Sequence, residues 1–153
     1  MPTYTTHEIK AYLPSGMRLL GLDVGTKTVG LALSDPTLTV ASPLQTIRRT
    51  KFSRDAEELE AIISEHDVGG LVVGLPLNMD SSEGRACQSV RQFAANLLAR
   101  NDLPLAFHDE RLSTAAVERM LVKEMDMTRA RRAKVVDKAA AAYILQGALD
   151  QAR

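Results

Sequence analysis

Three acidic residues stand at positions in this sequence where an acid is costly. Asp23 interrupts the apolar run "LLGLDVG", and Glu110 follows the apolar stretch "LAFH". Asp137 is spaced three and four residues from Ala140, Ala141 and later apolar residues that would form the buried stripe of a helix. Burying an unpaired carboxylate costs on the order of several kcal/mol or raises its pKa, so each of these acids requires a partner.

Two kinds of partner are compatible with these positions. Taken singly, Asp23 could cap its own turn, and Glu110 could pair with Arg111 or Lys138. The dipole of the last helix could likewise stabilise Asp137. Taken together, at two strand ends and on one helix face, the three acids favour a shared divalent cation. Open α/β sheets bind ligands beyond their strand ends, and hard cations such as Mg²⁺ prefer carboxylates, waters and phosphate oxygens.

Polar and basic side chains close to these acids in the sequence could contact phosphate groups. The candidates are Thr26, Lys27 and Thr28 after Asp23, Asn78 in "GLPLNMD", Arg111 after Glu110, and Arg129, Arg131, Arg132 and Lys134 before Asp137. A second basic cluster consists of Arg48, Arg49, Lys51 and Arg54. Charge runs are commonly solvated faces, but a cluster beside an acidic site would attract a phosphate backbone without reading its sequence. The 4% aromatic content argues against recognition by base stacking.

Two other reactive residue types have simpler explanations. Cys87 falls within an expected helix and is expected to pack in the core, so no cysteine nucleophile is needed. His108 is expected on the same strand face as Glu110, where it could support that acid from behind, although an ordinary half-buried histidine explains it as well.

Hydrophobic periodicity predicts the elements that must position these residues. Strands are expected over residues 18–24, 29–34, 38–47, 69–76 and 105–110, and Pro43 places the third at a sheet edge. Helices are expected after an N-cap at Ser53, over about 83–100, after Ser113 or Thr114, and over about 135–152, with 127–134 as a basic connector. This order predicts an α/β fold with a five-stranded mixed sheet flanked by helices on both faces.

Composition bounds the class of protein. The 153 residues suit one domain, expected over 18–153, with residues 1–17 as an N-terminal arm. The 19 basic residues balance 19 acidic ones, so any nucleic-acid surface must be local. A single cysteine, no signal-like segment and no apolar run of about 20 residues predict a cytoplasmic protein that does not enter a membrane.

Four blocks of the sequence resemble the YqgF family, also called RuvX, which has an RNase H-like fold. The blocks are "GLDVGTKTVGLALSD", "VVGLPLNMDSSEG", "DERLST" and "VVDKAAAAYILQGALD", within residues 18–150. The family is described as pre-16S rRNA nucleases and, earlier, as Holliday junction resolvases. The resemblance implies an acidic site at Asp23, Glu110 and Asp137, one or two Mg²⁺ or Mn²⁺ ions, and phosphodiester hydrolysis. Ser81 stands where family members commonly have glycine, which bears on the shape of that loop.

The resulting functional hypothesis is a metal-dependent endonuclease that processes the 5′ end of pre-16S rRNA. The alternatives are a Holliday junction resolvase acting on four-way DNA and a non-catalytic, nucleic-acid-binding ribosome-assembly module. Expected partners are nucleic acid, with precursor rRNA preferred to branched DNA, and a ribosome or pre-ribosomal particle, for a monomer or homodimer. Kinases of the sugar kinase and actin superfamily share a similar first loop, but they close two domains around a nucleotide, and this chain has room for one.

Overall fold

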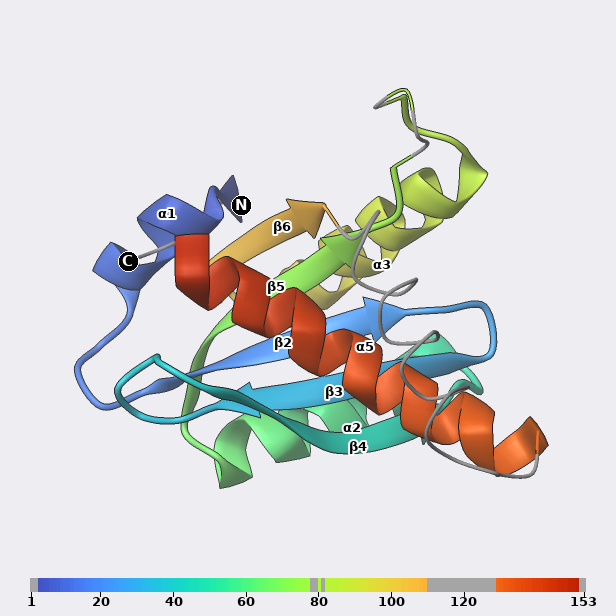
Figure 1. Cartoon of the computed structure of the whole chain (residues 1–153), viewed down its shortest axis with the longest axis horizontal. Coiled ribbons are helices and arrows are strands. Elements are labelled where there is room, and N and C mark those ends of the chain that lie inside the picture. The colour runs from blue at the N-terminus through green and yellow to red at the C-terminus, as the bar shows by residue number, and fades with distance from the viewer. Residues whose placement is uncertain (1–2, 78–79, 81, 110–128, 152–153) are drawn as a thin grey trace.

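The computed structural model describes residues 3–77, 80, 82–109 and 129–151, and only the backbone of residues 3, 6, 7 and 129–138. Its centre is a mixed sheet with the strand order β1-β6-β5-β2-β3-β4 (Figure 1). In chain order the elements are β1 (Thr3–Tyr4), α1 (Thr6–Ile9), η1 (Lys10–Tyr12), β2 (Arg18–Val24), β3 (Thr28–Ser34), β4 (Ala41–Arg48), α2 (Phe52–Glu65), β5 (Val68–Leu75), α3 (Arg85–Arg100), β6 (Leu105–Asp109) and α5 (Arg129–Gln151).

The central strand β2 joins two kinds of pairing. It runs antiparallel to β3, which runs antiparallel to β4, whereas β5 lies parallel to β2 and β6 parallel to β5. All eight residues of β5 are buried, as expected for a strand covered on both faces. The predicted mixed sheet of five strands is confirmed, and the N-terminal arm adds β1, a two-residue strand parallel to β6.

Helices cover both faces of the sheet, as predicted. In Figure 1, α5 crosses one face diagonally, while α2 and α3 lie behind the other. Side-chain alternation divides β2 between two cores: Leu20 and Leu22 pack with α2 and α3, whereas Leu19 packs with α5. A residue's position along a strand therefore decides which helix layer it faces.

The first turns of α5 differ from the prediction. Residues 129–134 were expected in a connector, but the structure shows them as helix. Alanine, arginine and lysine are strong helix formers, so this segment has no local reason to break the helix. The basic positions Arg129, Arg131, Arg132 and Lys134 therefore share a rigid element with Asp137.

Two predicted boundaries are also wrong, for local reasons. Strand β4 begins at Ala41 instead of residue 38, because Leu38 has φ 58°, which no extended strand accommodates. Helix α2 begins at Phe52 with Lys51 at its N-cap position, so Ser53 is not the cap, and no side chain caps this end. Pro43 does lie on an edge strand, opposite a shift in the pairing register.

Of the two remaining helix predictions, one is confirmed and the other falls on residues that the structure does not describe. Helix α3 starts at Arg85, close to the expected position, and buries the predicted stripe of Val90, Phe93, Ala94, Leu97 and Leu98. The helix expected after residue 113 lies outside the described residues. No helix in the described part of the chain has the length and apolar character needed to cross a bilayer.

The N-terminal arm packs onto the end of the domain. A reciprocal capping box starts α1: Glu8 N–H donates to the Thr5 hydroxyl at 3.2 Å, and Thr5 N–H donates to the Glu8 carboxylate at 3.0 Å. Ile9 is 1% exposed, and Tyr4 stacks on Tyr12 with ring centroids 4.1 Å apart. Helix α1 also contacts α5, so the arm covers part of the sheet edge and of the C-terminal helix.

Candidate active site

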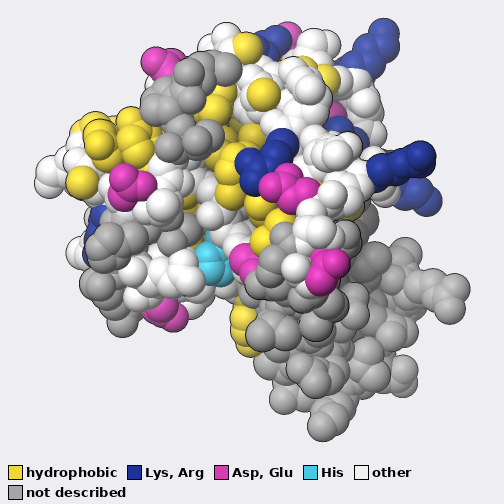
Figure 2. All heavy atoms as spheres, turned by 90° about the horizontal axis from the view of Figure 1, so that it is seen from above, with side chains coloured by type: hydrophobic (Ala, Val, Ile, Leu, Met, Phe, Trp, Pro, Cys, Tyr) yellow, Lys and Arg dark blue, Asp and Glu magenta, His cyan; other side chains and the backbone are white. Residues whose placement is uncertain are grey.

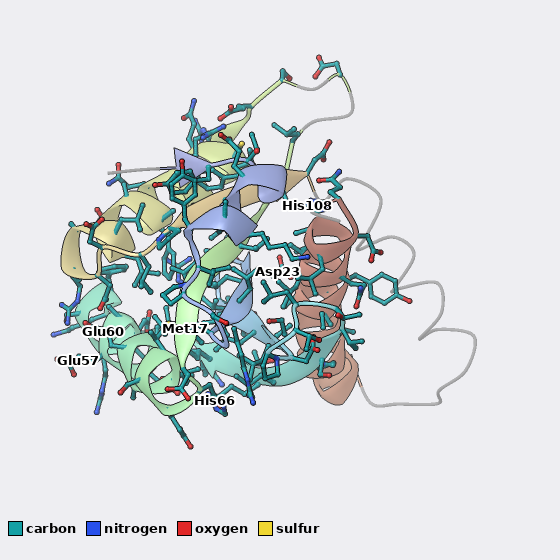
Figure 3. The ribbon with its side chains drawn as sticks, turned by 90° about the vertical axis from the view of Figure 1, so that its left-hand side faces the viewer. Met17, Asp23, Glu57, Glu60, His66 and His108 are labelled. Atoms are coloured by element: carbon teal, nitrogen blue, oxygen red, sulfur yellow. The ribbon has the colours of Figure 1, made fainter. Side chains whose placement is uncertain are left out.

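Asp23 lies half-buried near the carboxyl end of the central strand β2 (Figure 3). Its register partner on β3 is Gly30. On the other side, β2 and β5 pair Leu22 with Val73, so the next pair along is Asp23 with Gly74. Glycine thus occupies the neighbouring position on both adjacent strands.

A close contact between β2 and α5 fixes the face on which Asp23 lies. A Cβ atom on Gly21 would fall 2.8 Å from Leu145 Cβ and 3.1 Å from the Ala141 carbonyl oxygen, so only glycine lets the strand and helix approach this closely. Residues two apart on a strand share a face. Asp23 therefore faces the α5 layer, the layer that also contains position 137.

The hairpin after Asp23 presents the first group of predicted substrate contacts. Thr26 and Lys27 are exposed at its tip, and Thr28 is half-buried at the start of β3. Gly25 N–H donates to the Thr28 carbonyl oxygen at 2.8 Å, which closes the turn. The structure thus brings Asp23 and these three residues to one end of the sheet.

The other predicted site residues fall where the structure gives less detail. Glu110, Arg111 and Asn78 lie outside the described residues. For Asp137, Arg129, Arg131, Arg132 and Lys134 only the helical backbone is described. Among the side chains that the structure does describe, no three His, Cys, Asp or Glu residues come together as a metal site, and that comparison leaves out two of the three predicted acids.

His108 packs beneath the C-terminal half of α5. A Cβ atom on Gly147 would lie 2.7 Å from His108 Nε2, so the imidazole and the helix backbone are in close contact (Figure 3). Burial lowers the pKa of His108, while the charge of Asp109 and a hydrogen bond with Gln151 act in the opposite direction. The imidazole therefore favours its neutral form. Its support of Glu110 stays a prediction.

Arg49 has a structural role that sequence reasoning missed. Its backbone N–H donates to the Lys27 carbonyl oxygen at 2.8 Å, and its Nη1 donates to the Gly25 carbonyl oxygen at 2.6 Å. The guanidinium also lies 5.2 Å from the ring centroid of Phe93. Arg49 therefore ties the hairpin beside Asp23 to the connection between β4 and α2. No local motif marks a contact between segments 24 residues apart.

On the opposite face of the sheet, Cys87 is fully buried near the start of α3. Burial, together with Glu83, raises the pKa of its thiol, which keeps it protonated and unreactive. Glu83 forms an ion pair with Arg91 at 2.6 Å, and Arg91 lies 4.8 Å from the ring centroid of Phe107. Cys87 is thus a packing residue, as predicted.

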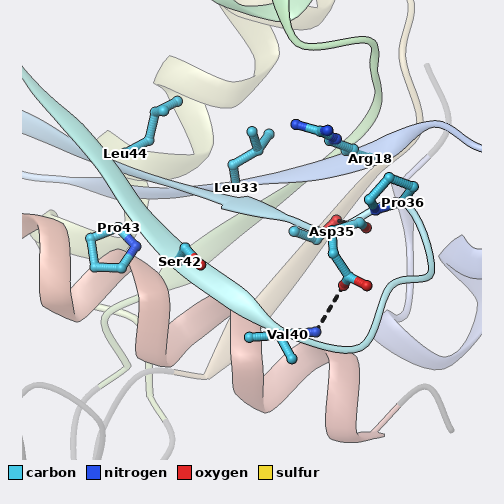
Figure 4. A pocket seen from close by; sticks show the side chains of 9 residues that line it. Arg18, Leu33, Asp35, Pro36, Val40, Ser42, Pro43 and Leu44 are labelled. Carbon is cyan, nitrogen blue, oxygen red and sulfur yellow. Dashed lines mark hydrogen bonds between the residues drawn. The ribbon is translucent and has the colours of Figure 1, made fainter.

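A pocket lies at the other end of the sheet, where β2 begins and β3 ends. It has a volume of about 380 Å³ (Figure 4). Its lining residues are Arg18, Leu33, Ser34, Asp35, Pro36, Val40, Ser42, Pro43 and Leu44. Asp35 accepts hydrogen bonds from the Thr37 hydroxyl, from Thr39 N–H at 2.7 Å and from Val40 N–H at 2.9 Å. These bonds hold the pKa of Asp35 well below its usual range, so this carboxylate organises its own loop.

On the face seen in Figure 2, the described side chains form no broad patch of one charge. Figure 2 shows acidic, basic and hydrophobic side chains interspersed over one side of the molecule. This mixture agrees with the balance of 19 basic and 19 acidic residues in the whole chain. Any attraction of a polyanion must therefore come from a local cluster.

Solved structures with a similar fold are Holliday junction resolvases. RuvC of Thermus thermophilus, solved in complex with Holliday junction substrate, aligns with a TM-score of 0.54 over 87% of this chain and 93% of RuvC, at 13% identity. The yeast mitochondrial Holliday junction resolvase Ydc2 aligns with a TM-score of 0.53 over 96% of this chain and 84% of its own, at 11% identity. At such low sequence identity, these alignments show the fold alone. It is the RNase H-like fold of RuvC-type proteins.

Sequence comparison narrows this class to one family. Residues 17–151 match the family described as "RuvX: Holliday junction resolvase". A protein of Paramagnetospirillum magneticum named "Putative pre-16S rRNA nuclease" is 60% identical over 150 residues, covering 98% of this chain and 96% of the relative. A protein of Rhodospirillum centenum with the same name is 62% identical over 151 residues, covering 95% and 80%. The chain belongs to the RuvX family, which confirms the resemblance found in its four sequence blocks.

Proposed function

We propose that this chain is a divalent-metal-dependent endonuclease that hydrolyses nucleic-acid phosphodiesters and processes the 5′ end of precursor 16S rRNA. The observation that carries the proposal is Asp23, a carboxylate near the carboxyl end of the central strand, between two glycine positions and on the α5 face. Membership of the RuvX family supports the reaction class, and the names of the relatives support the RNA substrate.

The metal ligands in this proposal are Asp23, Glu110 and Asp137. Asp23 fits such a role, because a half-buried carboxylate near a strand end is a hard oxygen donor of the kind that Mg²⁺ binds. Glu110 directly follows β6, two residues after His108, which faces α5. Strand alternation continued to Glu110 would give it the same face.

The backbone of α5 supports the inclusion of Asp137. Ala141 contacts Gly21, and position 137 is one turn earlier in the helix, or about 6 Å along its axis. From Gly21 to Asp23 the strand advances by about 6.6 Å. Because α5 runs back across β2 in the opposite sense (Figure 1), these two steps lead toward the same end of the sheet.

In this mechanism a bound divalent ion supplies activation of the attacking water and stabilisation of the departing oxyanion. Lys27, Thr26 and Thr28 orient the scissile phosphate from the hairpin. Phosphates on either side are held by Asn78, Arg111, Arg129, Arg131, Arg132 and Lys134. No covalent intermediate on a side chain is required, and the burial of Cys87 agrees with that.

A Holliday junction resolvase is the second candidate, favoured by the family description and by the fold of RuvC. A resolvase must cut two strands symmetrically and therefore acts as a dimer. A non-catalytic ribosome-assembly module is the third candidate, with the same surface but no cleavage. For all three candidate functions, the proposed compartment is the cytoplasm and the proposed nuclease or binding domain is residues 18–153. For the two candidates that act on RNA, the proposed partner is a pre-ribosomal particle.

The test compares a precursor 16S rRNA fragment with a four-way DNA junction, with and without Mn²⁺, alongside the mass of the protein in solution. The proposal expects Mn²⁺-dependent cleavage of the RNA near its 5′ processing site and none by an Asp23→Asn variant. Paired cuts in the junction by a dimer would establish the resolvase instead. Binding of RNA without cleavage in any divalent ion would establish the assembly module.

A further inference from the structure

Four basic side chains from three segments lie at the same end of the sheet as Asp23. They are Lys27 in the hairpin, Arg48 at the end of β4, and Lys51 and Arg54 at the start of α2, and together we call them the basic ledge. All four are exposed. Strands β2 and β4 run in the same direction, since both are antiparallel to β3, so their carboxyl ends lie at one end of the sheet (Figure 1).

The strand register gives the separation between Asp23 and the ledge. Asp23 pairs with Gly30, Gly30 pairs with Thr46, and Arg48 is two residues further along β4. Two strand spacings and a two-residue advance put the Cα atoms of Asp23 and Arg48 about 12 Å apart. One strand of a duplex carries a phosphate about every 3.4 Å of helix axis. A duplex whose axis ran from Asp23 toward Arg48 would therefore place three or four phosphates of one strand over this distance.

Part of the ledge shares the α5 face with Asp23. Ile47 is buried in the core beneath α2 and α3, so its neighbours Thr46 and Arg48 belong to the opposite face of β4. Lys51 and Arg54 follow at the turn into α2, which covers the other face. The ledge therefore runs from the active-site face around the end of the sheet.

Hydrogen bonds and ring contacts hold these three segments together. Arg49 joins the β4–α2 connection to the hairpin through two hydrogen bonds, as described above. The buried carboxylate of Asp55 accepts from Thr50 N–H at 3.1 Å and from the Thr50 hydroxyl at 3.2 Å. Phe52 packs edge-on against Phe93 at 5.4 Å. The four cations thus project from one rigid support.

The ledge cations take no part in the ion pairs of the described side chains. Among the side chains that the structure describes, the ion pairs join Arg91 with Glu83 and Arg100 with Glu60, and none involves the ledge. Lys51 at the N-cap of α2 and Arg54 in its first turn also place positive charge where it opposes the helix dipole. Local choices that cost stability are expected at functional sites.

We infer that the basic ledge is a phosphate-binding track for the part of the nucleic acid that continues from the scissile position across β4 to the start of α2. This inference rests on the proposed function. Phe52 is half-buried and Phe93 is buried against it, so the ledge offers no stacking platform for bases. The track therefore binds RNA and DNA through phosphates, without reading sequence.

The experiment measures binding of a labelled single-stranded RNA in EDTA across a range of salt concentrations. Replacing Lys51 and Arg54 with alanine removes two phosphate contacts. The slope of log K against log salt should then decrease in magnitude by about 1.4 for a single strand, and by about 1.8 for a duplex of the same length. The variant Lys51→Arg with Arg54→Lys keeps both charges and should keep the wild-type slope.

The matched control is Lys10→Ala with Arg18→Ala, which removes the same charge at the other end of the sheet. It should leave the slope unchanged, and thermal melts verify that every variant is folded. The proposed phosphate track would be overturned if Lys51→Ala with Arg54→Ala left the slope unchanged. It would also be overturned if the control lost as much slope as this variant.

Cleavage is scored separately with Mn²⁺, so the two proposals can fail independently. A wild-type protein that cleaves nothing but shows the ledge-dependent slope overturns the nuclease and retains the track. One that cleaves but has a ledge-independent slope overturns the track alone. A wild-type protein that binds no nucleic acid overturns the track as well.

Discussion

The two ends of the central sheet each carry an aspartate, and the two are positioned in different ways. Asp35, just after β3, is fixed by donors from its own loop, which include the Thr37 hydroxyl and two backbone N–H groups. Asp23 belongs to a strand that is paired on both sides, so the backbone ladders hold its Cα in place. The sheet places Asp23 independently of what its carboxylate binds, whereas Asp35 must bind its loop to keep the loop folded.

The difference teaches how to separate structural acids from candidate catalytic acids. A loop aspartate followed by Thr37 and Thr39 satisfies its own neighbours, and its lowered pKa is the signature of those bonds. Asp23, by contrast, has glycine positions on both neighbouring strands. The lowered pKa of Asp35 therefore reflects a structural role.

The largest expected difference between substitutions at Asp23 and at Asp35 is in cleavage. Asp23→Asn should lower the rate about 10³-fold or more, because a missing ligand removes several kcal/mol of transition-state stabilisation. The unliganded variant should be as stable as the wild type or slightly more so, because the substitution removes one of the like charges of the proposed three-acid site. A gel-based cleavage assay and thermal melts without metal measure both. The comparison variant Asp35→Asn should cleave normally, and full activity in Asp23→Asn would remove Asp23 from the mechanism.

Divalent metal should stabilise one end of the molecule selectively. At a Mn²⁺ concentration of about 100 times the Kd, the wild type should gain about 2.7 kcal/mol by mass action. Melts with and without Mn²⁺ should show a smaller gain for Asp23→Asn and an unchanged gain for Asp35→Asn. Equal shifts in all three proteins would mean that Asp23 does not ligate the ion.

The contact of β2 with α5 offers a smaller perturbation. Gly21→Ala places a methyl group against Leu145 Cβ and the Ala141 carbonyl, and should cost about 1–3 kcal/mol by overpacking. This contact fixes how far Asp23 on β2 lies from position 137 on α5. Cleavage should therefore decrease even where the variant is fully folded. Gly69→Ala overpacks Leu13 and Met17 at the opposite end of the sheet instead, and serves as the control. Equal cleavage by the two folded variants would show that the Gly21 contact does not position the site.

The smallest effect is expected at Asp35 and depends on pH. The pKa of this carboxyl is lower in the folded protein than the ordinary value near 3.9, so its contribution to stability is complete above that value and is lost as the pH falls through the lower, folded-state pKa. Asp35→Ala should reduce the urea midpoint at pH 7, and the difference from wild type should shrink below about pH 4. A difference that is constant over this range would mean that the charge of Asp35 contributes nothing to its loop.

Much of the fold could be predicted because period-2 and period-3.6 patterns report burial directly. The stripe of α3, the apolar run of β5 and the edge position of Pro43 follow from side-chain type alone. The bounds of β4 and α2 could not be predicted from hydrophobic periodicity, because the left-handed φ of Leu38 and the hydrogen bond from Thr50 to Asp55 leave no trace in it. For the site, the sequence indicated Asp23 but not the glycine on either side, since partners across strands are set by register and not by spacing along the chain.

The pairing of β1 with β6 has a consequence for the order in which the chain completes its fold. Thr3 lies opposite Leu105, and α1 contacts α5, so the arm docks on segments made roughly a hundred residues later. At about 5–20 residues per second, the arm waits on the order of 5 to 20 s during synthesis before its docking surface exists. The arm can therefore dock only after β6 and α5 have been made, which makes its docking a late event in folding during synthesis.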